Sequence, residues 1–316
     1  MSRFPFPDAP NGWFQVAWSD ELAPGEARPV RAFGRDLVLF RTESGQARVF
    51  DAWCPHLGAH LGVGGRVEGE TLRCPFHAWR FDGEGRCVEI PYAKRIPPAA
   101  RVPCWPTREV NGLVMVWHHA ERAAPDYELP ELPEIGSPDW TPYVKRRYQL
   151  RTHCQEMGEN LVDAAHFRYV HGTLTVAEGS FEEDGPRLHV LNRARMGTPR
   201  GEVDGTIDVH MWGPGFATVR FGGIVDTLLV ESTTPIDGET VDVFFSFSVK
   251  RTGDADATRG VGRALIADID KQIREDRPIW ENKVYHARPV LCDGDGPIPK
   301  WRRWYRQFYS ERPHAA

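Results

Sequence analysis

The sequence reads C-P-H-L-G-A-H-L-G-V-G-G-R-V-E-G-E-T-L-R-C-P-F-H from Cys54 to His77. Cys54 and His56 form a C-x-H pair at the start of this stretch, and Cys74 and His77 form a C-x-x-H pair at its end. Two thiols and two imidazoles on two loops can converge on one metal centre. Zinc fingers usually take both cysteines from one segment and both histidines from another. Each loop here supplies one of each, which indicates a different kind of centre.

A [2Fe-2S] cluster fits this mixed pattern, because one of its irons can bind both thiolates and the other both imidazoles. Four glycines in the same stretch allow backbone to pass close to a cluster whose sulfides accept N–H bonds, namely Gly58, Gly62, Gly64 and Gly65. Structural zinc and two unrelated pairs in turns are the alternatives. We favour the cluster.

Composition limits the class of protein. A chain of 316 residues can bury a sizeable core and is expected to hold two domains. The formal charge of -5 provides no positive surface for nucleic acid or an anionic membrane. No apolar run suggests a transmembrane segment or a signal peptide. We therefore expect a cytoplasmic protein whose other cysteines are reduced thiols, namely Cys87, Cys104, Cys154 and Cys292.

The first part of the chain predicts a small antiparallel β domain. Short runs that alternate apolar and polar residues between turn signals fill residues 12–50, and strand signals return at 71–74, 86–90 and 113–117. The ligand loops would then be tips on a rigid sheet. We place this domain at residues 1–120. Residues 121–139 are rich in proline and acids and predict an extended connector.

Residues 140–316 predict a second domain. A strand at 143–151 leads into a helical pattern at 155–167, and further strands are expected at 188–191, 205–212, 217–221, 226–232 and 241–249. Apolar residues then recur at helical spacing over 259–275. The pattern predicts a large antiparallel sheet with a long C-terminal helix packed on it.

A second group of potential ligands lies in the stretch N-L-V-D-A-A-H-F-R-Y-V-H, from Asn160 to His171. On an ideal helix Asp163 and His166 lie roughly 60° apart, whereas His166 and His171 diverge by about 140°. Both imidazoles can bind one ion only if the helix is bulged or ends between them. Since the first domain would carry electrons, a mononuclear iron(II) held by two histidines and a carboxylate is the site that they would reach.

The third ligand must be a carboxylate from elsewhere in the chain. The predicted C-terminal helix offers four acids, namely Asp268, Asp270, Glu275 and Asp276. Helical periodicity alone does not select one of them.

The motifs resemble those of Rieske non-haem iron oxygenases. C-P-H-L-G-A-H-L-G-V-G-G-R-V and C-P-F-H-A-W-R-F resemble the cluster loops of this family, and N-x-x-D-x-x-H-x4-H resembles its catalytic iron motif. Blocks along nearly the whole chain, from G-W-F-Q-V-A-W-S-D-E-L-A-P-G-E to R-R-W-Y-R-Q-F-Y, resemble the Neverland-type cholesterol 7-desaturases. They also resemble, less closely, the oxygenase component of 3-ketosteroid 9-alpha-hydroxylase.

This resemblance implies an α+β fold, with an N-terminal antiparallel β Rieske domain and a C-terminal helix-grip (START-like) catalytic domain. It implies that the [2Fe-2S] ligands are Cys54, His56, Cys74 and His77. It implies roles around a mononuclear Fe(II) for His166, His171 and Asp276 as ligands, for Asp163 as a bridge toward the cluster, and for Asn160 near the iron. Asp276 is chosen because R-E-D-R-P-I-W-E-N-K resembles the ligand segment of steroid-acting members, and because Pro278 predicts a helix break beside it.

The implied activity is O2-dependent monooxygenation of a sterol or steroid, by hydroxylation or desaturation of an unactivated C–H position. Electrons would come from NAD(P)H through a ferredoxin or flavin reductase, and the family commonly forms homotrimers. The alternatives are a Rieske oxygenase that hydroxylates or demethylates a non-steroid apolar or aromatic substrate, and a non-enzymatic Rieske electron carrier. Candidate pocket residues are Trp212, Phe216, Phe221 and Phe245, although core packing accounts for most aromatic residues on such strands.

Overall fold

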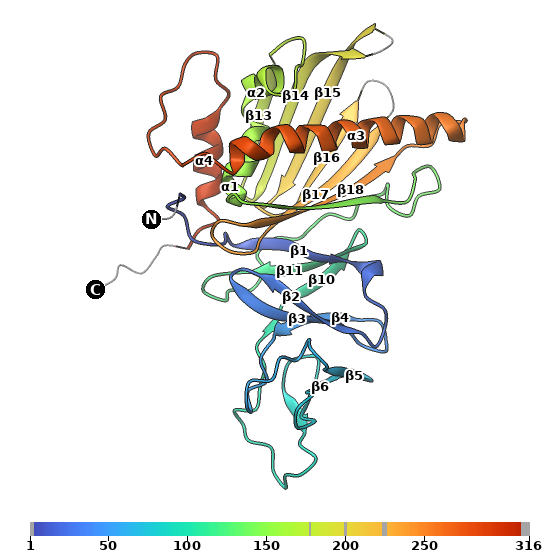
Figure 1. Ribbon diagram of the computed structural model, residues 1–316, viewed down its shortest axis with the longest axis vertical. Coiled ribbons are helices and arrows are strands. Elements are labelled where there is room, and N and C mark those ends of the chain that lie inside the picture. Colours follow the sequence, from blue (N-terminus) through green and yellow to red (C-terminus); the bar gives the residue numbers. More distant parts are fainter. Residues whose placement is uncertain (1–2, 177, 199–200, 223–225, 311–316) are drawn as a thin grey trace. The chain divides into compact units, whose positions relative to one another are not determined.

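The computed structural model describes residues 3–176, 178–198, 201–222 and 226–310. The chain divides into a smaller unit, Trp13–Asp126, and a larger unit made of Met1–Gly12 and Tyr127–Ala316 (Figure 1). The N-terminal segment therefore belongs to the larger unit, although the sequence analysis places it in the first domain. Backbone hydrogen bonding supports this division, since the N–H of Asn11 donates to the carbonyl of Phe308 at 2.6 Å.

Antiparallel strands build the smaller unit, as the alternating pattern predicts. Its described strands form three sheets with the orders β1-β11-β10, β2-β3-β4-β9 and β5-β6-β7-β8. The apolar side chains of Phe40, Phe50, Leu72 and Phe81 are fully buried between them. The strands are β1 (Gly12–Trp18), β2 (Ala27–Ala32), β3 (Arg35–Arg41), β4 (Ala47–Asp51), β5 (Arg66–Glu68), β6 (Thr71–Arg73), β7 (Arg80–Phe81), β8 (Cys87–Glu89), β9 (Cys104–Trp105), β10 (Thr107–Val110) and β11 (Leu113–His118).

The larger unit is organised around one antiparallel sheet. In the described residues its order is β12-β18-β17-β16-β15-β14-β13. The strands are β12 (Val144–Leu150), β13 (Glu178–Asp184), β14 (Arg187–Thr198), β15 (Gly201–Trp212), β16 (Ala217–Gly222), β17 (Thr227–Pro235) and β18 (Val241–Val249). Strand β13 was not predicted, because its sequence E-G-S-F-E-E-D is acidic and it pairs only at the edge of the sheet.

A long helix, α3 (Ala255–Trp280), crosses one face of this sheet (Figure 1). Its residues Ile266, Ile269 and Ile273 are buried against the strands, which confirms the predicted packing. The predicted break at Pro278 is wrong, since α3 continues to Trp280. A proline removes one backbone donor, and the last turn of the helix here accommodates that loss.

Shorter helices complete the larger unit. The helix expected over 155–167 is broken into α1 (Cys154–Gly158), the 3-10 helix η2 (Glu159–Leu161) and α2 (Ala164–Tyr169). Near the C-terminus, α4 (Ile298–Arg306) buries the side chains of Trp301, Trp304 and Tyr305. Because α4 packs against α1 and η2, it fixes the segment that leads to the proposed iron ligands.

Candidate active site

Two loops of the smaller unit present the four predicted cluster ligands. The Cys54 loop follows β4 and the Cys74 loop joins β6 to β7. Each loop is closed by a backbone hydrogen bond, from the N–H of Cys54 to Ala59 at 2.9 Å and from the N–H of Cys74 to Trp79 at 2.8 Å. Loop closure by backbone holds each cysteine in place whatever its side chain binds.

The histidines of the two loops face one another. The ring centroids of His56 and His77 lie 4.7 Å apart. His56 also stacks on Trp79 at 4.6 Å and 9°, and the indole of Trp79 donates to the hydroxyl of Tyr92 at 2.8 Å. Trp79 and Tyr92 therefore orient a predicted ligand, a role that the sequence analysis did not assign.

Two observations fit a metal centre held by these loops. Nδ1 of His56 is buried and has no hydrogen-bond partner among the described residues, which leaves its lone pair or proton unsatisfied unless a ligand binds there. Burial raises the pKa of the Cys54 thiol to about 12, with Cys74 close against it. Two buried thiolates need cations as counter-charge, and iron would supply them.

Two glycines of this stretch lie close to backbone of the protein itself. A Cβ on Gly65 would lie 1.9 Å from the carbonyl oxygen of Leu61, and a Cβ on Gly62 would lie 2.8 Å from the backbone nitrogen of Pro29. Both positions exclude a side chain because protein backbone is close. The crowding that requires glycine at these two positions comes from the fold itself.

The short helix α2 begins and ends within the second group of ligands, which lets their side chains come together. Asp163 caps the N-terminus of α2, and its carboxylate accepts the backbone N–H of His166 at 3.3 Å. Helix α2 ends at Tyr169, before His171. The predicted condition, that the helix must end between the two histidines, is confirmed.

The carboxylate of Asp276, on α3, meets the two imidazoles. The ligand atoms of His166, His171 and Asp276 all lie within 4.8 Å of one another, and Nε2 of His171 is 3.2 Å from Oδ2 of Asp276. The second ring nitrogen of each histidine faces an oxygen. Nδ1 of His166 faces the backbone carbonyl of Asp163 at 2.5 Å, and Nδ1 of His171 faces Glu275 at 3.1 Å.

This arrangement has the chemistry of a metal site. Metal-binding histidines usually donate one N–H to a carboxylate or carbonyl, which directs the other nitrogen toward the ion. Burial lowers the pKa of His171, but hydrogen bonds and charge from Asp276 and Glu275 outweigh it and raise the pKa. Burial lowers the pKa of His166. A divalent cation between these groups would balance the two carboxylates that surround His171.

The other acids considered as third ligand have partners elsewhere. Asp270 accepts the hydroxyl of Tyr148 and pairs with Arg146 at 3.5 Å. Asp268 accepts the side-chain amide of Gln272 at 2.8 Å. Glu275 touches the remote nitrogen of His171, so it orients a predicted ligand. Of the four acids, the structure brings Asp276 to the two histidines.

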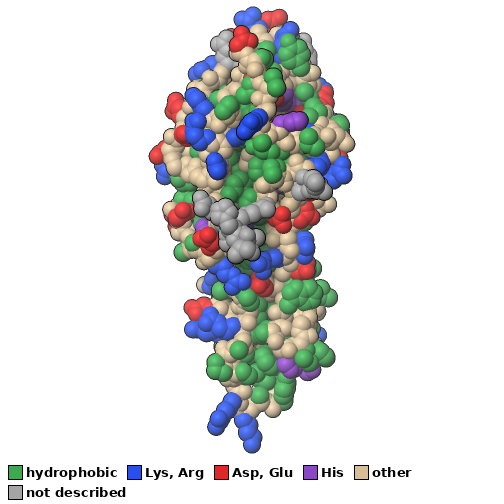
Figure 2. Space-filling model, turned by 90° about the vertical axis from the view of Figure 1, so that its left-hand side faces the viewer, with side chains coloured by type: hydrophobic (Ala, Val, Ile, Leu, Met, Phe, Trp, Pro, Cys, Tyr) green, Lys and Arg blue, Asp and Glu red, His purple; other side chains and the backbone are tan. Residues whose placement is uncertain are grey.

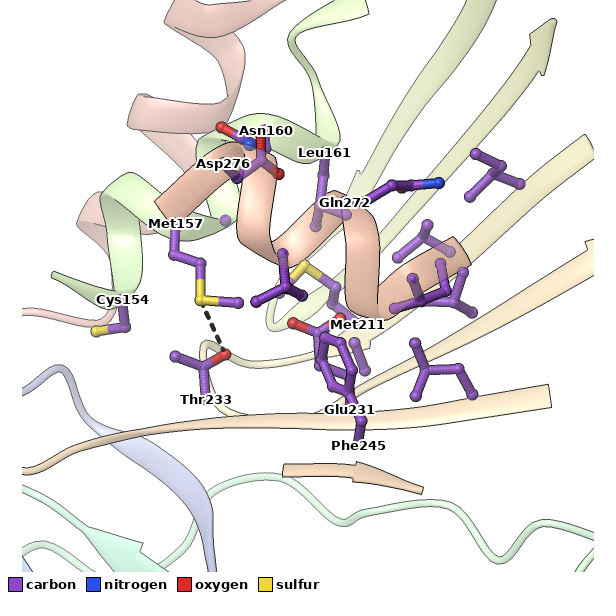
Figure 3. A pocket seen from close by; sticks show the side chains of 18 of the residues that line it. Cys154, Met157, Asn160, Leu161, Met211, Glu231, Thr233, Phe245, Gln272 and Asp276 are labelled. Carbon is purple, nitrogen blue, oxygen red and sulfur yellow. Dashed lines mark hydrogen bonds between the residues drawn. The ribbon is translucent and has the colours of Figure 1, made fainter. Parts of the chain in front are cut away.

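An apolar pocket adjoins this triad and lies between α3 and the strands (Figure 3). Its volume is about 150 Å³, roughly ten times what one water molecule needs, so it can hold an organic molecule. His166, His171, Asp276 and Asn160 form part of its wall. Figure 3 shows Asn160 beside Asp276, and the amide oxygen of Asn160 accepts the indole N–H of Trp280 at 3.4 Å.

Three of the four predicted pocket aromatics line this space, namely Phe216, Phe221 and Phe245. The prediction for Trp212 is wrong. Side chains alternate along β15, so Val209 and Met211 face the pocket while Trp212 lines a depression on the other side of the sheet.

The sequence analysis missed polar residues of the pocket, among them Gln272 and Glu231. Gln272 reaches the pocket from α3 and Glu231 from β17 (Figure 3). Glu231 lies opposite Phe245 on β18 and Ala217 on β16. A charged residue directly after an apolar run in a strand could have signalled its role, since Glu231 follows Leu228, Leu229 and Val230.

The comparisons with known proteins agree with this geometry. Residues 12–106 match the Rieske [2Fe-2S] domain, and residues 116–309 match the 3-ketosteroid 9alpha-hydroxylase C-terminal domain. The chain is a Rieske non-haem iron oxygenase. This Rieske oxygenase is 33% identical to a cholesterol 7-desaturase of Ciona intestinalis, over 96% of this chain and 70% of that protein. It is 32% identical to the oxygenase component of 3-ketosteroid-9-alpha-monooxygenase of Mycobacterium tuberculosis, over 95% and 82%.

Solved structures share the fold of this Rieske oxygenase. Dicamba monooxygenase bound to dicamba superimposes with a TM-score of 0.77 at 20% identity, over 94% of this chain and 96% of that one. NdmA of Pseudomonas putida CBB5 gives 0.76 at 22% identity, over 93% and 88%. The α+β architecture inferred from the sequence is thereby confirmed.

The cofactors follow from the family. The oxygenase carries a Rieske [2Fe-2S] cluster and a mononuclear iron, uses O2, and receives electrons from a ferredoxin or reductase. When bound, the two metal centres supply electron transfer and the activation of O2. Among the described residues, no helix is long and apolar enough to cross a bilayer.

Proposed function

We propose that this Rieske oxygenase acts on a sterol or steroid, at an unactivated C–H position. The match of residues 116–309 to the 3-ketosteroid 9alpha-hydroxylase C-terminal domain carries the proposal, because that segment contains both histidines, Asp276 and the residues of the apolar pocket. An apolar wall suits a substrate with few polar groups.

We propose the following roles for the chain's residues. Cys54, His56, Cys74 and His77 hold the cluster, and His166, His171 and Asp276 hold the mononuclear iron. Asp163 and Glu275 keep a proton on Nδ1 of His166 and His171, so that each Nε2 offers its lone pair to the metal. Apolar side chains of the sheet and of α3 hold the substrate beside this triad and exclude water, which protects the reacting position.

We also propose a homotrimer in which the cluster of one subunit serves the iron of the next. Large apolar side chains around the cluster loops support a docking surface there, since Leu57, Phe76 and Tyr92 are 65%, 61% and 62% exposed. Figure 2 shows hydrophobic side chains gathered in the lower part of the view, where Figure 1 places β5 and β6. Electrons would reach the cluster from a ferredoxin or flavin reductase that takes them from NAD(P)H. A cytoplasmic location also stays a prediction.

Turnover under a surrogate reductase tests the substrate class. Cholesterol, 4-androstene-3,17-dione and a simple aromatic acid would be supplied separately with NADH and O2, and products identified by mass spectrometry. A gain of 16 mass units would indicate hydroxylation and a loss of two would indicate desaturation. We expect product from a steroid nucleus only. Oxygenation of the aromatic acid but of neither steroid would refute the proposal and favour the non-steroid alternative.

A further inference from the structure

A row of polar side chains crosses the sheet on the face turned away from α3. Glu182 on β13 lies directly opposite His189 on β14, and His189 lies directly opposite His210 on β15. Asp208 precedes His210 by two residues and shares its face. The intervening residues on these strands, including Leu188 and Val209, are buried on the pocket side. The row is therefore separated from the iron triad by the sheet itself.

The polar atoms of this row converge. The ligand atoms of His189, Asp208 and His210 all lie within 4.8 Å of one another. Oδ1 of Asp208 is 2.7 Å from Nε2 of His189 and 3.3 Å from Nε2 of His210. The two imidazole rings stack at 4.3 Å and 11°, and Glu182 approaches Nδ1 of His189 at 3.9 Å. Three of the four residues, Glu182, His189 and His210, line a surface depression.

The charges around the row favour a cation. Without an ion, Oδ1 of Asp208 is the hydrogen-bond acceptor for both imidazoles. The carboxylate of Asp208 lies against both rings and supplies negative charge at the point where the two Nε2 atoms meet. Two arginines lie near the row: Arg220 pairs with Glu134 at 2.7 Å, which offsets its charge, and Arg187 lines the depression together with the acids Glu182, Glu183 and Asp184.

We propose that His189, His210 and Asp208 bind a divalent transition-metal ion, while Glu182 faces the other ring nitrogen of His189 and orients that imidazole. Two imidazole nitrogens and one carboxylate suit Zn²⁺, and the same set binds Cu²⁺ more tightly. Calcium and magnesium prefer all-oxygen sites and fit poorly here. The ion is a second kind of metal in this oxygenase, and its binding does not depend on the identity of the substrate.

Such an ion would brace one wall of the substrate pocket. Strand β15 presents His210 and Asp208 to the outer face, while Ile207, Val209 and Met211 of the same strand line the pocket. Coordination across β14 and β15 would cross-link two strands at the point where their inner side chains meet the substrate. Metal binding to the folded state would also stabilise the sheet.

Titration of the iron-loaded holoenzyme with Zn²⁺, followed by calorimetry, tests the site. We expect one ion to bind to the wild type and the affinity to fall by at least about tenfold in His210→Ala and in Asp208→Asn. His286→Ala is the matched control, because that histidine is exposed and lies outside the row. Cys104 and Cys292 are exposed thiols that also bind zinc, so all variants carry Cys104→Ser and Cys292→Ser.

A second measurement identifies the ligands. Cu²⁺ added to the oxidised holoenzyme should give an electron paramagnetic resonance spectrum with coupling to two nitrogens, reduced to one in His210→Gln. Iron content and cluster absorption, unchanged in every variant, would show that the protein is folded and that the iron site is intact. Equal Zn²⁺ affinity in the wild type and in His189→Ala/His210→Ala, or Cu²⁺ without nitrogen coupling, would overturn the proposal.

Discussion

Glu231 is a carboxyl group held in the wall of an apolar pocket. Burial raises the pKa of Glu231 to about 7, and a hydrogen bond with Thr233 opposes the rise only in part. Its folded-state pKa is therefore above the value of about 4.3 that an unfolded chain would show. The stabilisation that the neutral form provides is fully present below about pH 4.3 and is lost as the pH rises through 7.

We expect Glu231→Gln to remove this pH dependence. Relative to the variant, the wild type should lose stability between pH 5 and pH 8, by at most about 3 kcal/mol, because roughly two pH units lie between pH 5 and the folded-state pKa of about 7, at 1.36 kcal/mol each. Thermal unfolding of both proteins at the two pH values measures the difference. Parallel curves for wild type and variant would show that the carboxyl group is not desolvated in the folded protein.

Asp276 and its neighbour Glu275 offer a matched pair of acids with different predicted roles. Asp276→Ala should lose about one iron per chain and all turnover, while the absorption of the cluster stays unchanged. Glu275→Gln should keep the iron, because an amide oxygen can still accept the Nδ1–H of His171. Iron analysis and absorption spectra of the two variants check this. Full activity in Asp276→Ala would reopen the choice among Asp268, Asp270 and Glu275.

For single residues, the sequence identified candidate ligands well but predicted their contacts poorly. The H-x4-H spacing alone did not identify His166 and His171 as ligands; the cluster motif in the first domain and the resemblance to Rieske oxygenases were needed as well. Adjacent acids such as Glu275 and Asp276 differ by only about 100° around a helix. Asp276 contacts Nε2 of His171 and Glu275 contacts Nδ1. This choice depends on how α3 packs on the sheet, and no local sequence pattern predicts that packing.

Helices α1 and α4 approach each other so closely that one position requires glycine. A Cβ on Gly158 would lie 2.6 Å from the buried ring of Trp301. The indole N–H of Trp301 donates to the carbonyl of Gln155 at 3.2 Å, and Arg302 pairs with Glu159 at 2.6 Å. These contacts hold the chain immediately before Asn160.

Gly158→Ala should destabilise the larger unit by about 1–3 kcal/mol, because an added methyl group must displace the indole ring. Gly260→Ala is the control, since Gly260 lies in α3 and a Cβ there would meet no other atom within 4 Å; it should be neutral or stabilising by up to about 1 kcal/mol. Urea unfolding of both variants gives the comparison. Equal stability would mean that α4 can move away from α1 at little cost.

The predicted boundaries of helices were wrong where the local sequence pattern was weak or misleading. Pro278 suggested an early end to α3. A proline removes only one backbone hydrogen bond, and a helix that packs along its whole length can continue past that loss. Helix α4 has Trp301, Trp304 and Tyr305 at helical spacing, but it is only nine residues long and follows a proline-rich segment. Tertiary packing stabilises it, and packing is not visible in a short window.

The proposed trimer gives Asp163 a role that its own subunit does not reveal. Within the chain its carboxylate caps α2 and its carbonyl faces His166. Asp163→Asn should keep both metals, the trimer and the backbone bond to His166, but slow electron transfer from the reduced cluster to the iron by at least about tenfold, because the neutral amide would accept more weakly from a cluster-ligand histidine of the neighbouring subunit. Single turnover of the pre-reduced enzyme with substrate and O2 measures the rate.

Asp268→Asn serves as the control for that experiment, since Asp268 contacts Gln272 and neither histidine. A normal rate and product yield in Asp163→Asn would rule out the bridge. Light scattering provides an independent check, because a monomeric wild type would exclude transfer between subunits whatever the rate of the variant.

The two-domain organisation was predictable because the metal motifs and the proline-rich connector are strong local signals. The place of the first twelve residues was not, since they contain no periodic pattern. Their position depends on contacts with distant segments, such as the hydrogen bond from Arg3 to the carbonyl of Glu281 at 2.8 Å. Contacts between residues so far apart in the sequence cannot be predicted from local composition.

Insertion of the smaller unit between Gly12 and Tyr127 has a consequence for biosynthesis. Translation proceeds from the N-terminus at roughly 5–20 residues per second, so Trp13–Asp126 emerges roughly 10–40 s before α4 does. The N-terminal segment is synthesised first, but the backbone hydrogen bond from Asn11 to Phe308 can form only after Phe308 has been synthesised. The chain of the iron-sulfur unit is thus complete while the oxygenase unit that encloses it in the sequence still lacks its last helix.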